Sequence, residues 1–249
     1  MRRTLQVLTV LFALLSAFGF AWAPRAPGAA LEVLDRSGHP TTRITDGNTV
    51  RLRLTLPSPV SNPQTYTFKL DDLGLVIGTC EIASGSSCES DPFASLGWHW
   101  DPGGMARNNR VVKAVDAKGA LVAQSPRVAV LPRPVVMVHG FLSSSDTWDD
   151  YIGPDGFLAS LGIRGFAVGD GRFPGVMNTG VISNPPATTN TIAQNAAVEA
   201  QYIAAVKKAT SAQMVDLVGH SMGGMISRYY IDRLMRDRDV AQLLSLIHI

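Results

Sequence analysis

The stretch Met-Val-Asp-Leu-Val-Gly-His-Ser-Met-Gly-Gly-Met-Ile-Ser-Arg-Tyr-Tyr occupies residues 214–230 and decides the fold of the second half of the chain. Its apolar start predicts a short buried strand, and apolar residues at helical spacing after the glycines predict a helix. Between them, Gly219-His220-Ser221-Met222-Gly223 fits the pattern G-x-S-x-G, in which a serine stands on a sharp strand-to-helix turn. Such a turn projects the serine Oγ away from the backbone, and the first N–H groups of the helix point towards an oxyanion beside it. We therefore predict that Ser221 is a nucleophile.

The glycines of this motif have a steric role. Glycine at 219 and 223 removes the Cβ atoms that would otherwise clash across so tight a turn. The alternative interpretation is a glycine-rich loop that opens an ordinary helix. Because the motif has a predicted strand before it and a predicted helix after it, the catalytic interpretation is the stronger one.

Composition places the chain among folded proteins. Its 249 residues are enough for one large domain or two small ones, and 46% apolar with 17% charged residues is typical of globular packing. The formal net charge of +2, without any basic run, gives no indication of a nucleic-acid or charged-membrane role. The sequence does not indicate an oligomeric state.

The N-terminus has the features of a secretory signal peptide. Met1-Arg2-Arg3 is positively charged, residues 5–22 are mostly apolar, and Ala21-Trp22-Ala23 is a small-x-small cleavage motif, with a second candidate site at Ala26-Pro27-Gly28. We therefore predict that residues 1–28 are a signal peptide and that the protein is secreted or periplasmic. The alternative is an uncleaved membrane anchor, which the polar residues at positions 6, 9 and 16 disfavour.

The cysteines of the chain, Cys80 and Cys88, stand close together in the sequence. In an exported protein such a pair is typically a disulfide that closes a local loop, whereas a metal site would require more ligands. We expect this bond to stabilise the fold and to have no role in catalysis.

Residues 29–131 show the pattern of an all-β domain. Residues 50–56, 66–70 and 111–115 alternate apolar and polar side chains, and turn residues separate them, which predicts a β-sandwich. Residues 97–101 and 109–119 resemble the last strands of bacterial immunoglobulin-like modules, which implies an immunoglobulin-like sandwich. We expect Trp98 and Trp100 to pack on a strand rather than to stack on a sugar, and His99 between them has no evident partner.

A second domain is predicted for residues 132–249, after the stiff linker Leu131-Pro132-Arg133-Pro134. Residues 135–138 form an unbroken apolar run, which is typical of a strand buried on both faces of a parallel sheet. His139-Gly140-Phe141 follows directly. Together with Gly219-His220-Ser221-Met222-Gly223, it resembles the α/β-hydrolase family, in particular secreted bacterial lipases and esterases. The resemblance implies an oxyanion hole formed by the N–H groups of Phe141 and Met222, and histidines at 139 and 220 that do not act as the base.

Between these motifs the sequence predicts alternating strands and helices, and hence a parallel sheet with helices on both faces. Residues 143–146 can cap a helix that contains Trp148, Tyr151 and Ile152. A strand is expected over residues 165–168, and a longer helix after the capping box Thr191-Ile192-Ala193-Gln194. Residues 169–190 form a long loop that can act as a lid. Its apolar residues at positions 173, 177, 181 and 182 can line an acyl pocket, and simple packing of the loop is an equally good interpretation.

The base and the acid of a serine triad are not evident. The resemblance implies the order serine, acid, histidine, and after Ser221 the candidates are Asp232, Asp237, Asp239 and His248. Asp232 forms an i, i+4 series with arginines at 228 and 236, which is typical of a solvated helix face, and His248 stands next to the C-terminus. One back-translation of residues 244–249 reads like a transposon adapter end. We therefore expect that the C-terminal part of the domain is missing and that the natural chain continues differently; natural termination is the alternative.

The sequence thus predicts a serine hydrolase that cleaves carboxylic esters of lipid or other apolar acyl groups through an acyl-enzyme on Ser221. No metal or organic cofactor is implied, and contact with a membrane or lipid surface would follow from such a substrate. The alternatives are an acyltransferase or amidase on the same fold, and a non-catalytic surface or adhesion protein that binds through its β-sandwich. Without a triad acid and histidine, we expect the 249-residue chain itself to be inactive.

Overall fold

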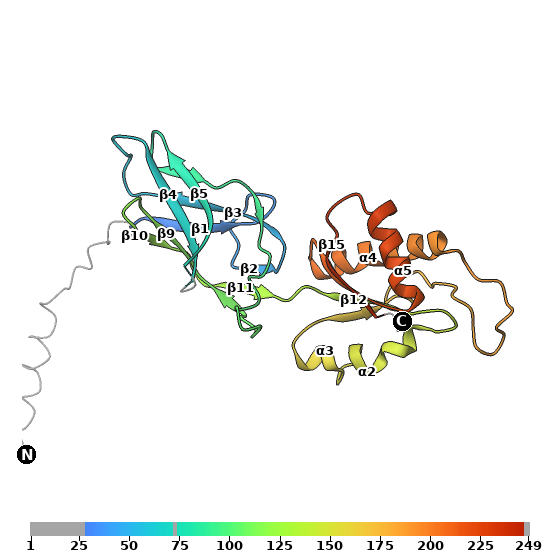
Figure 1. Ribbon diagram of the computed structural model, residues 1–249. Helices are drawn as coiled ribbons and strands as arrows, with labels where there is room; N and C mark the ends of the chain where they lie inside the picture. Colours follow the sequence, from blue (N-terminus) through green and yellow to red (C-terminus); the bar gives the residue numbers. More distant parts are fainter. Residues whose placement is uncertain (1–27, 72–73, 247–249) are drawn as a thin grey trace, which may run out of the picture.

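The computed structural model describes residues 28–71 and 74–246. These residues form an N-terminal part made of strands, residues 28–131, and a C-terminal part made of strands and helices, residues 132–246. Figure 1 shows the two parts side by side, joined by the extended segment between β11 (Val128–Leu131) and β12 (Val135–Val138). All but the last residue of the predicted signal peptide, and His248, lie outside the described residues. Within the described ranges, no helix is long and apolar enough to cross a membrane.

The N-terminal part is built from short, mostly antiparallel strands. They are β1 (Ala30–Leu34), β2 (Arg43–Thr45), β3 (Thr49–Thr55), β4 (Gln64–Leu70), β5 (Leu75–Ile82), β6 (Ser87–Glu89), β7 (Phe93–Ala94), β8 (Asn109–Arg110), β9 (Val112–Val115), β10 (Leu121–Gln124) and β11. One sheet has the order β1-β3-β6 with β7 also on β3, a second has the order β10-β9-β4-β5, and a third, smaller sheet is β2-β11-β8. In the third sheet β11 and β2 are parallel.

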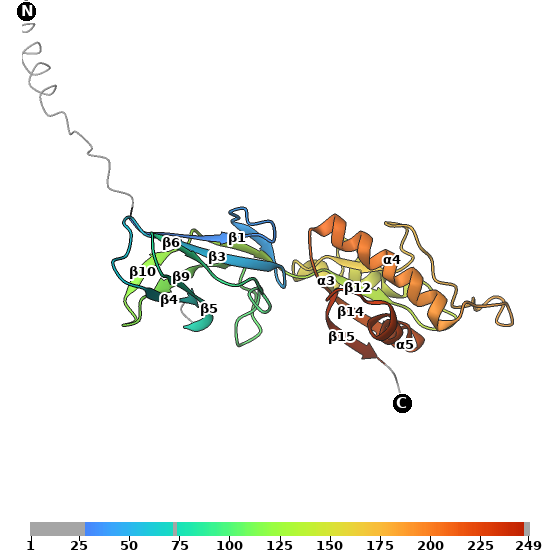
Figure 2. The same cartoon turned by 90° about the horizontal axis from the view of Figure 1, so that it is seen from above.

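The period-two alternation of these strands puts one face of each into a common core. On β3, Val50, Leu52 and Leu54 are buried, while the arginines between them are half-buried. Phe68 of β4 and Ala114 of β9 belong to the same cluster but come from the other four-stranded sheet. The two four-stranded sheets therefore face each other across one core (Figure 2). Burying each large apolar side chain contributes about 1.5–3 kcal/mol, so this core is the main source of stability in the N-terminal part.

The predicted disulfide is confirmed: Cys80 and Cys88 are bonded. Cys80 lies on β5 and Cys88 on β6, and these strands belong to different sheets. The bond therefore joins the two sheets in addition to closing the loop between the cysteines. Because the loop is short and the entropic effect grows only with the logarithm of its length, the expected stabilisation is modest.

The prediction of a strand around Trp98 and Trp100 is wrong, because residues 96–99 form turns. The carboxylate of Asp46 accepts the N–H groups of Gly97 at 3.1 Å and His99 at 2.7 Å, which holds the chain in this bend. His99 also has a side-chain partner, since its Nδ1 lies 3.0 Å from the carbonyl oxygen of Val130. Trp98 still packs into the core, as expected.

The C-terminal part combines a parallel sheet with helices. Its elements are β12, the 3-10 helix η2 (Ser145–Trp148), α2 (Asp149–Ile152), α3 (Phe157–Ser160), β13 (Gly165–Ala167), α4 (Ile192–Thr210), β14 (Val215–His220), α5 (Met222–Tyr229), the π-helix η3 (Tyr230–Leu234) and β15 (Val240–Leu246). The strands lie in the order β13-β12-β14-β15, and every neighbouring pair is parallel.

The sheet has helices on both faces, as the apolar run at 135–138 predicts. All four residues of β12 are buried. Val136 and Val138 pack into a cluster with residues of α4 and α5, whereas Val135 and Met137 pack into a second cluster with Trp148 of η2 and residues of α3. Figure 1 shows α2 and α3 on one side of the sheet and α4 and α5 on the other.

The two predicted helix starts have different outcomes. The capping box of α4 is confirmed, because the Thr191 side chain accepts the N–H of Gln194 and the Gln194 side chain accepts the N–H of Thr191. At residues 143–152, the expected single helix is replaced by the short segments η2 and α2, and the capping residue Ser144 makes no side-chain cap bond. Ser143 and Ser145 instead bond to Thr147 and to the carbonyl of Gly169.

The segment between the two parts is not a free spacer. Arg133 is buried and pairs with Asp46 of the N-terminal part and with Asp216 on β14. Nearby, the Asn48 side chain accepts the N–H of Gln213 at 2.9 Å and donates to the carbonyl of Ser211 at 3.0 Å. These polar contacts dock the N-terminal part against the amino end of β14.

Candidate active site

Ser221 stands alone between a strand and a helix. β14 ends at His220 and α5 begins at Met222, so one residue makes the whole turn. Its φ of 53° and ψ of −123° lie in a region that non-glycine residues rarely adopt, which costs about 1–3 kcal/mol. Ser221 is the N-cap of α5, yet its side chain makes no capping bond, and the residue is exposed. The hydroxyl is therefore free for a role other than capping.

The glycines of the motif allow neighbouring backbones to approach closely. A Cβ on Gly223 would lie 2.2 Å from the carbonyl oxygen of Val138, and a Cβ on Gly219 would lie 2.7 Å from the backbone of Gly224. Both distances are far shorter than a van der Waals contact and involve backbone atoms, which cannot move aside. The G-x-S-x-G spacing is thus a packing requirement of this turn.

The two motifs identified in the sequence meet at one end of the sheet. Val138 of β12 is the register partner of Gly219 of β14, so the residues after both strands emerge side by side. A Cβ on Gly140 would lie 3.0 Å from both the Ser221 Cβ and the His220 carbonyl oxygen. The His139-Gly140-Phe141 segment therefore passes directly against Ser221.

Two backbone N–H groups at this point have no acceptor in the described part of the chain. Leu142 N–H bonds to the carbonyl of Thr179, and Gly224 N–H bonds to the carbonyl of Ser221. By contrast, Phe141 N–H and Met222 N–H donate to no acceptor among the described residues, and the first residue of a helix has no intrahelical acceptor. Unsatisfied donors beside an exposed serine suit an oxyanion that develops during the reaction.

His139 is a supporting residue of this loop. It is 2% exposed, and its Nδ1 lies 3.3 Å from the Thr179 hydroxyl and 3.3 Å from the carbonyl oxygen of Gly140. Burial lowers the pKa of His139, against the opposing effects of the Gly140 carbonyl and Asp146, so the ring is neutral at neutral pH. A hydrogen bond to the Ser221 hydroxyl is found neither for His139 nor for any other histidine within residues 28–71 and 74–246.

Two of the aspartates after Ser221, Asp232 and Asp239, have other partners. The predicted solvated helix face is confirmed for Arg228 of α5 and Asp232 of η3, which are exposed. Arg236 lies beyond the helix, because η3 ends at Leu234, and Asp232 pairs with its neighbour Arg233 at 2.7 Å. Asp239 pairs with Lys207 of α4 and accepts the Tyr230 hydroxyl at 2.8 Å. These contacts assign Asp232 and Asp239 structural roles.

The contacts that hold the His139 loop were not predicted from the sequence. Thr179 is 1% exposed, and its hydroxyl donates to the carbonyl of Ser143 at 3.1 Å. Two residues fix Thr179 in turn: Asn178 N–H donates to Asn195 Oδ1 at 3.0 Å, and Asn195 Nδ2 donates back to the Asn178 carbonyl at 3.2 Å. The run Asn178-Thr179-Gly180 is the one sequence signal for this network, because such residues commonly form turns.

A cavity of about 340 Å³ opens next to the loop, lined by His139, the serines at 143–145 and residues 176–181. Of the apolar loop residues considered for an acyl pocket, Met177 and Val181 line this cavity. Phe173 instead packs against Phe166 and Tyr202 in the core, and Ile182 is exposed. The 169–190 segment is thus held by individual residues such as Phe173 and Met177, and it is exposed throughout residues 181–186.

An acidic side chain is buried behind the serine helix. Glu199 of α4 is fully buried and accepts the hydroxyl of Ser227 on α5 at 2.7 Å. Burial raises the pKa of Glu199 to about 8, although the Ser227 bond acts in the opposite direction. Its second oxygen has no partner among the described residues. A protonated, neutral Glu199 is therefore the form that fits this packing at neutral pH.

A comparison with known protein families gives a match to the part of the chain that contains Ser221. Residues 187–244 match the family model described as Lipase (class 2). The matched range contains α4, β14, the Ser221 turn and α5. No curated protein matches the chain. The match supports a lipase family, and hence a lipase- or esterase-type hydrolase, for this part of the chain.

Proposed function

We infer that this protein is a serine hydrolase that cleaves carboxylic esters, with Ser221 as the nucleophile. One observation carries the proposal: Ser221 is held at φ 53° and ψ −123° beside two N–H groups without acceptors. Such strain persists only where surrounding packing enforces it, and it clusters at functional sites. The lipase match over residues 187–244 supports the same conclusion.

The proposed reaction uses Ser221 and the two backbone donors in sequence. The Ser221 Oγ attacks the ester carbonyl carbon while its proton passes to a base, and Phe141 N–H and Met222 N–H stabilise the tetrahedral oxyanion. The tetrahedral intermediate then collapses and expels the alkoxide, which takes the proton from the base and departs as the alcohol. The acyl group stays bound to the Ser221 Oγ. Water then releases the acid by the reverse sequence. The base and its orienting acid would come from outside the described residues.

The substrate class follows from the surface around Ser221. Phe141 and Met225 are exposed at the serine turn, and Val181 and Ile182 are exposed on the neighbouring loop. Exposed apolar side chains beside a polar reaction centre favour an ester with an apolar acyl group, presented by a lipid surface. We also propose the architecture of the protein: it is exported, and an immunoglobulin-like sandwich precedes an α/β-hydrolase domain.

A fluorophosphonate probe tests this proposal, because its phosphoryl oxygen takes the place of the oxyanion. In the full-length protein, we expect covalent labelling at Ser221, located by peptide mass spectrometry, and parallel turnover of p-nitrophenyl esters. Ser221→Ala should lose both labelling and turnover. Ser143→Ala should keep both, because Ser143 is a nearby serine that does not stand on a strand-to-helix turn. Labelling that persists in Ser221→Ala, or a folded full-length protein that never labels, would refute the assignment and favour a binding role for the N-terminal part.

A further inference from the structure

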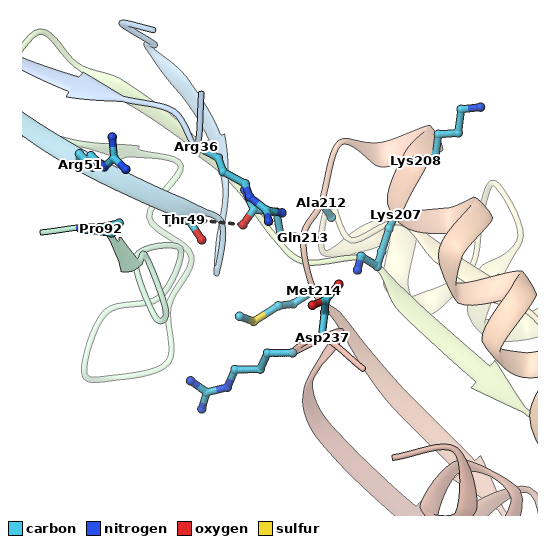
Figure 3. Close-up of a pocket in the computed structure, with 11 residues that line it drawn as sticks. Arg36, Thr49, Arg51, Pro92, Lys207, Lys208, Ala212, Gln213, Met214 and Asp237 are labelled. Atoms are coloured by element: carbon cyan, nitrogen blue, oxygen red, sulfur yellow. Dashed lines mark hydrogen bonds between the residues drawn. The ribbon is translucent and has the colours of Figure 1, made fainter. Parts of the chain in front are cut away.

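A cleft of about 660 Å³ lies between the two parts of the chain (Figure 3). Met214, which lines it, precedes β14, and Ser221 follows that strand. At about 3.3 Å per strand residue, the two positions are about 23 Å apart, so the cleft is at the opposite end of the sheet from the serine. It is therefore separate from the proposed ester site.

Three arginines reach this cleft from three different places in the chain. Arg36 follows β1, Arg51 lies on β3, and Arg238 precedes β15. Within the described ranges, none of the three forms an ion pair. Six described arginines outside the cleft pair with carboxylates: Arg53, Arg107, Arg110, Arg133, Arg172 and Arg233. Other described arginines, such as Arg127, form no ion pair either, so the feature that matters here is that three unpaired arginines line one cleft. Unpaired positive charges gathered in one cleft repel each other, which is unfavourable unless an anion binds there.

The remaining charges of the cleft leave it positive. Lys207 lines the cleft but is neutralised by Asp239. Lys208 is at the rim, where Figure 3 shows its side chain pointing away from the other residues. Asp237 is the one carboxylate among the lining residues. Three unpaired arginines against a single unpaired carboxylate leave an excess of positive charge.

The arginines are carried by elements that are fixed relative to each other. Thr49 N–H, two residues before Arg51, donates to the Gln213 side chain at 3.0 Å across the cleft, drawn as a dashed line in Figure 3. Asn48 makes two more bonds to the same loop. A ligand in the cleft therefore meets arginines from both parts on backbone segments that are already held in place, and only the arginine side chains have to be ordered.

We propose that this cleft binds a group that carries two or more phosphates. The guanidinium fork matches phosphate oxygens in a bidentate way, and arginines contributed by both parts suit an extended, multiply charged anion. A volume of about 660 Å³ holds on the order of twenty water molecules, which is too large for a single phosphate. By bridging the two parts, such a ligand would also stabilise their docked arrangement.

Inorganic tripolyphosphate is the probe for a soluble ligand, and vesicles that contain diphosphatidylglycerol, whose head group carries two phosphates, are the probe for a lipid. Calorimetric titration at low salt should show tripolyphosphate binding that weakens steeply with added NaCl, and bound ligand should raise the thermal unfolding midpoint. Arg36→Gln and Arg51→Gln should each weaken binding at least tenfold, the loss expected for a charge-assisted hydrogen bond. Arg127→Gln, which removes an exposed arginine outside the cleft, should change it less than twofold.

The two probes separate the sources of phosphate. Loss of binding in the cleft variants, with either probe, supports the site, and the probe that binds identifies the source. Absence of binding to both probes at low salt would overturn the proposal. Equal weakening in Arg127→Gln and the cleft variants would also overturn it, because the effect would then be one of net charge. Circular dichroism of each variant checks that these surface substitutions leave the fold intact.

Discussion

Arg133 and Asp46 form a buried ion pair between the two parts of the chain. The Asp46 side chain is inaccessible to solvent and also accepts the N–H groups of Gly97 and His99. The Nε of Arg133 donates at 2.9 Å to Asp216, whose strand ends immediately before Ser221. The N-terminal part is thus connected, through one guanidinium, to the strand that carries the proposed nucleophile.

Arg133→Met should therefore destabilise the protein by about 3–5 kcal/mol, because it leaves the Asp46 carboxylate buried without a counter-charge. Arg53→Met is the matched control, since its ion pairs with Glu32 and Glu89 are partly exposed and contribute about 0–1 kcal/mol. Denaturant unfolding of the three proteins measures both values. Equal, small losses in the two variants would show that the parts are not coupled through Arg133.

Patterns local in the sequence predicted most of the fold. The alternation along β3, the apolar run of β12 and the capping box at Thr191 each depend on a few neighbouring residues, and each is confirmed. The bend at residues 96–99 was not predictable in this way, because it depends on Asp46, some fifty residues earlier. The Thr179 network was missed for the same reason: its partners come from α4 and from the segment after β12.

Glu199 should make stability depend on pH. Because its pKa is raised from 4.5 to about 8, the folded protein keeps a proton that the unfolded chain loses between these values. The contribution of Glu199 is therefore fully present below about pH 4.5, is lost as pH rises through this window, and is constant above about pH 8. In Glu199→Gln, which cannot ionise but can still accept from Ser227, this loss should vanish.

Unfolding free energies at pH 5 to 9 test this. Relative to the parent, Glu199→Gln should gain stability with rising pH, by at most about 1.4 kcal/mol per pH unit, and the gain should level off above about pH 8. Glu81→Gln, an exposed glutamate on β5, should follow the parent profile. A difference between Glu199→Gln and the parent that is constant with pH would mean that Glu199 is ionised in the folded protein.

Gly223→Ala should be among the most damaging single substitutions in the chain. Its Cβ would lie 2.2 Å from the Val138 carbonyl oxygen, so β12 and α5 would have to separate, at a cost above about 4 kcal/mol. Gly78→Ala is the control on β5. The nearest atom to a Cβ at this position lies 3.6 Å away, so the substitution should be neutral or stabilise the protein by up to about 1 kcal/mol. Thermal unfolding of both variants gives the comparison, and a mild effect at position 223 would contradict the turn geometry.

The strain at Ser221 gives a prediction that does not depend on substrate or on a base. Ser221→Ala keeps a Cβ at φ 53° and ψ −123°, so its stability should stay within about 0.5 kcal/mol of the parent. Ser221→Gly relieves the backbone strain, which stabilises the folded protein by about 1–3 kcal/mol. The glycine also makes the unfolded chain more flexible, which lowers the stability by up to about 1 kcal/mol. We therefore expect Ser221→Gly to be more stable than Ser221→Ala by about 1 kcal/mol, measured by denaturant unfolding. If the glycine variant were the less stable of the two, Ser221 would not be strained, and the main geometric argument for a nucleophile at this position would fail.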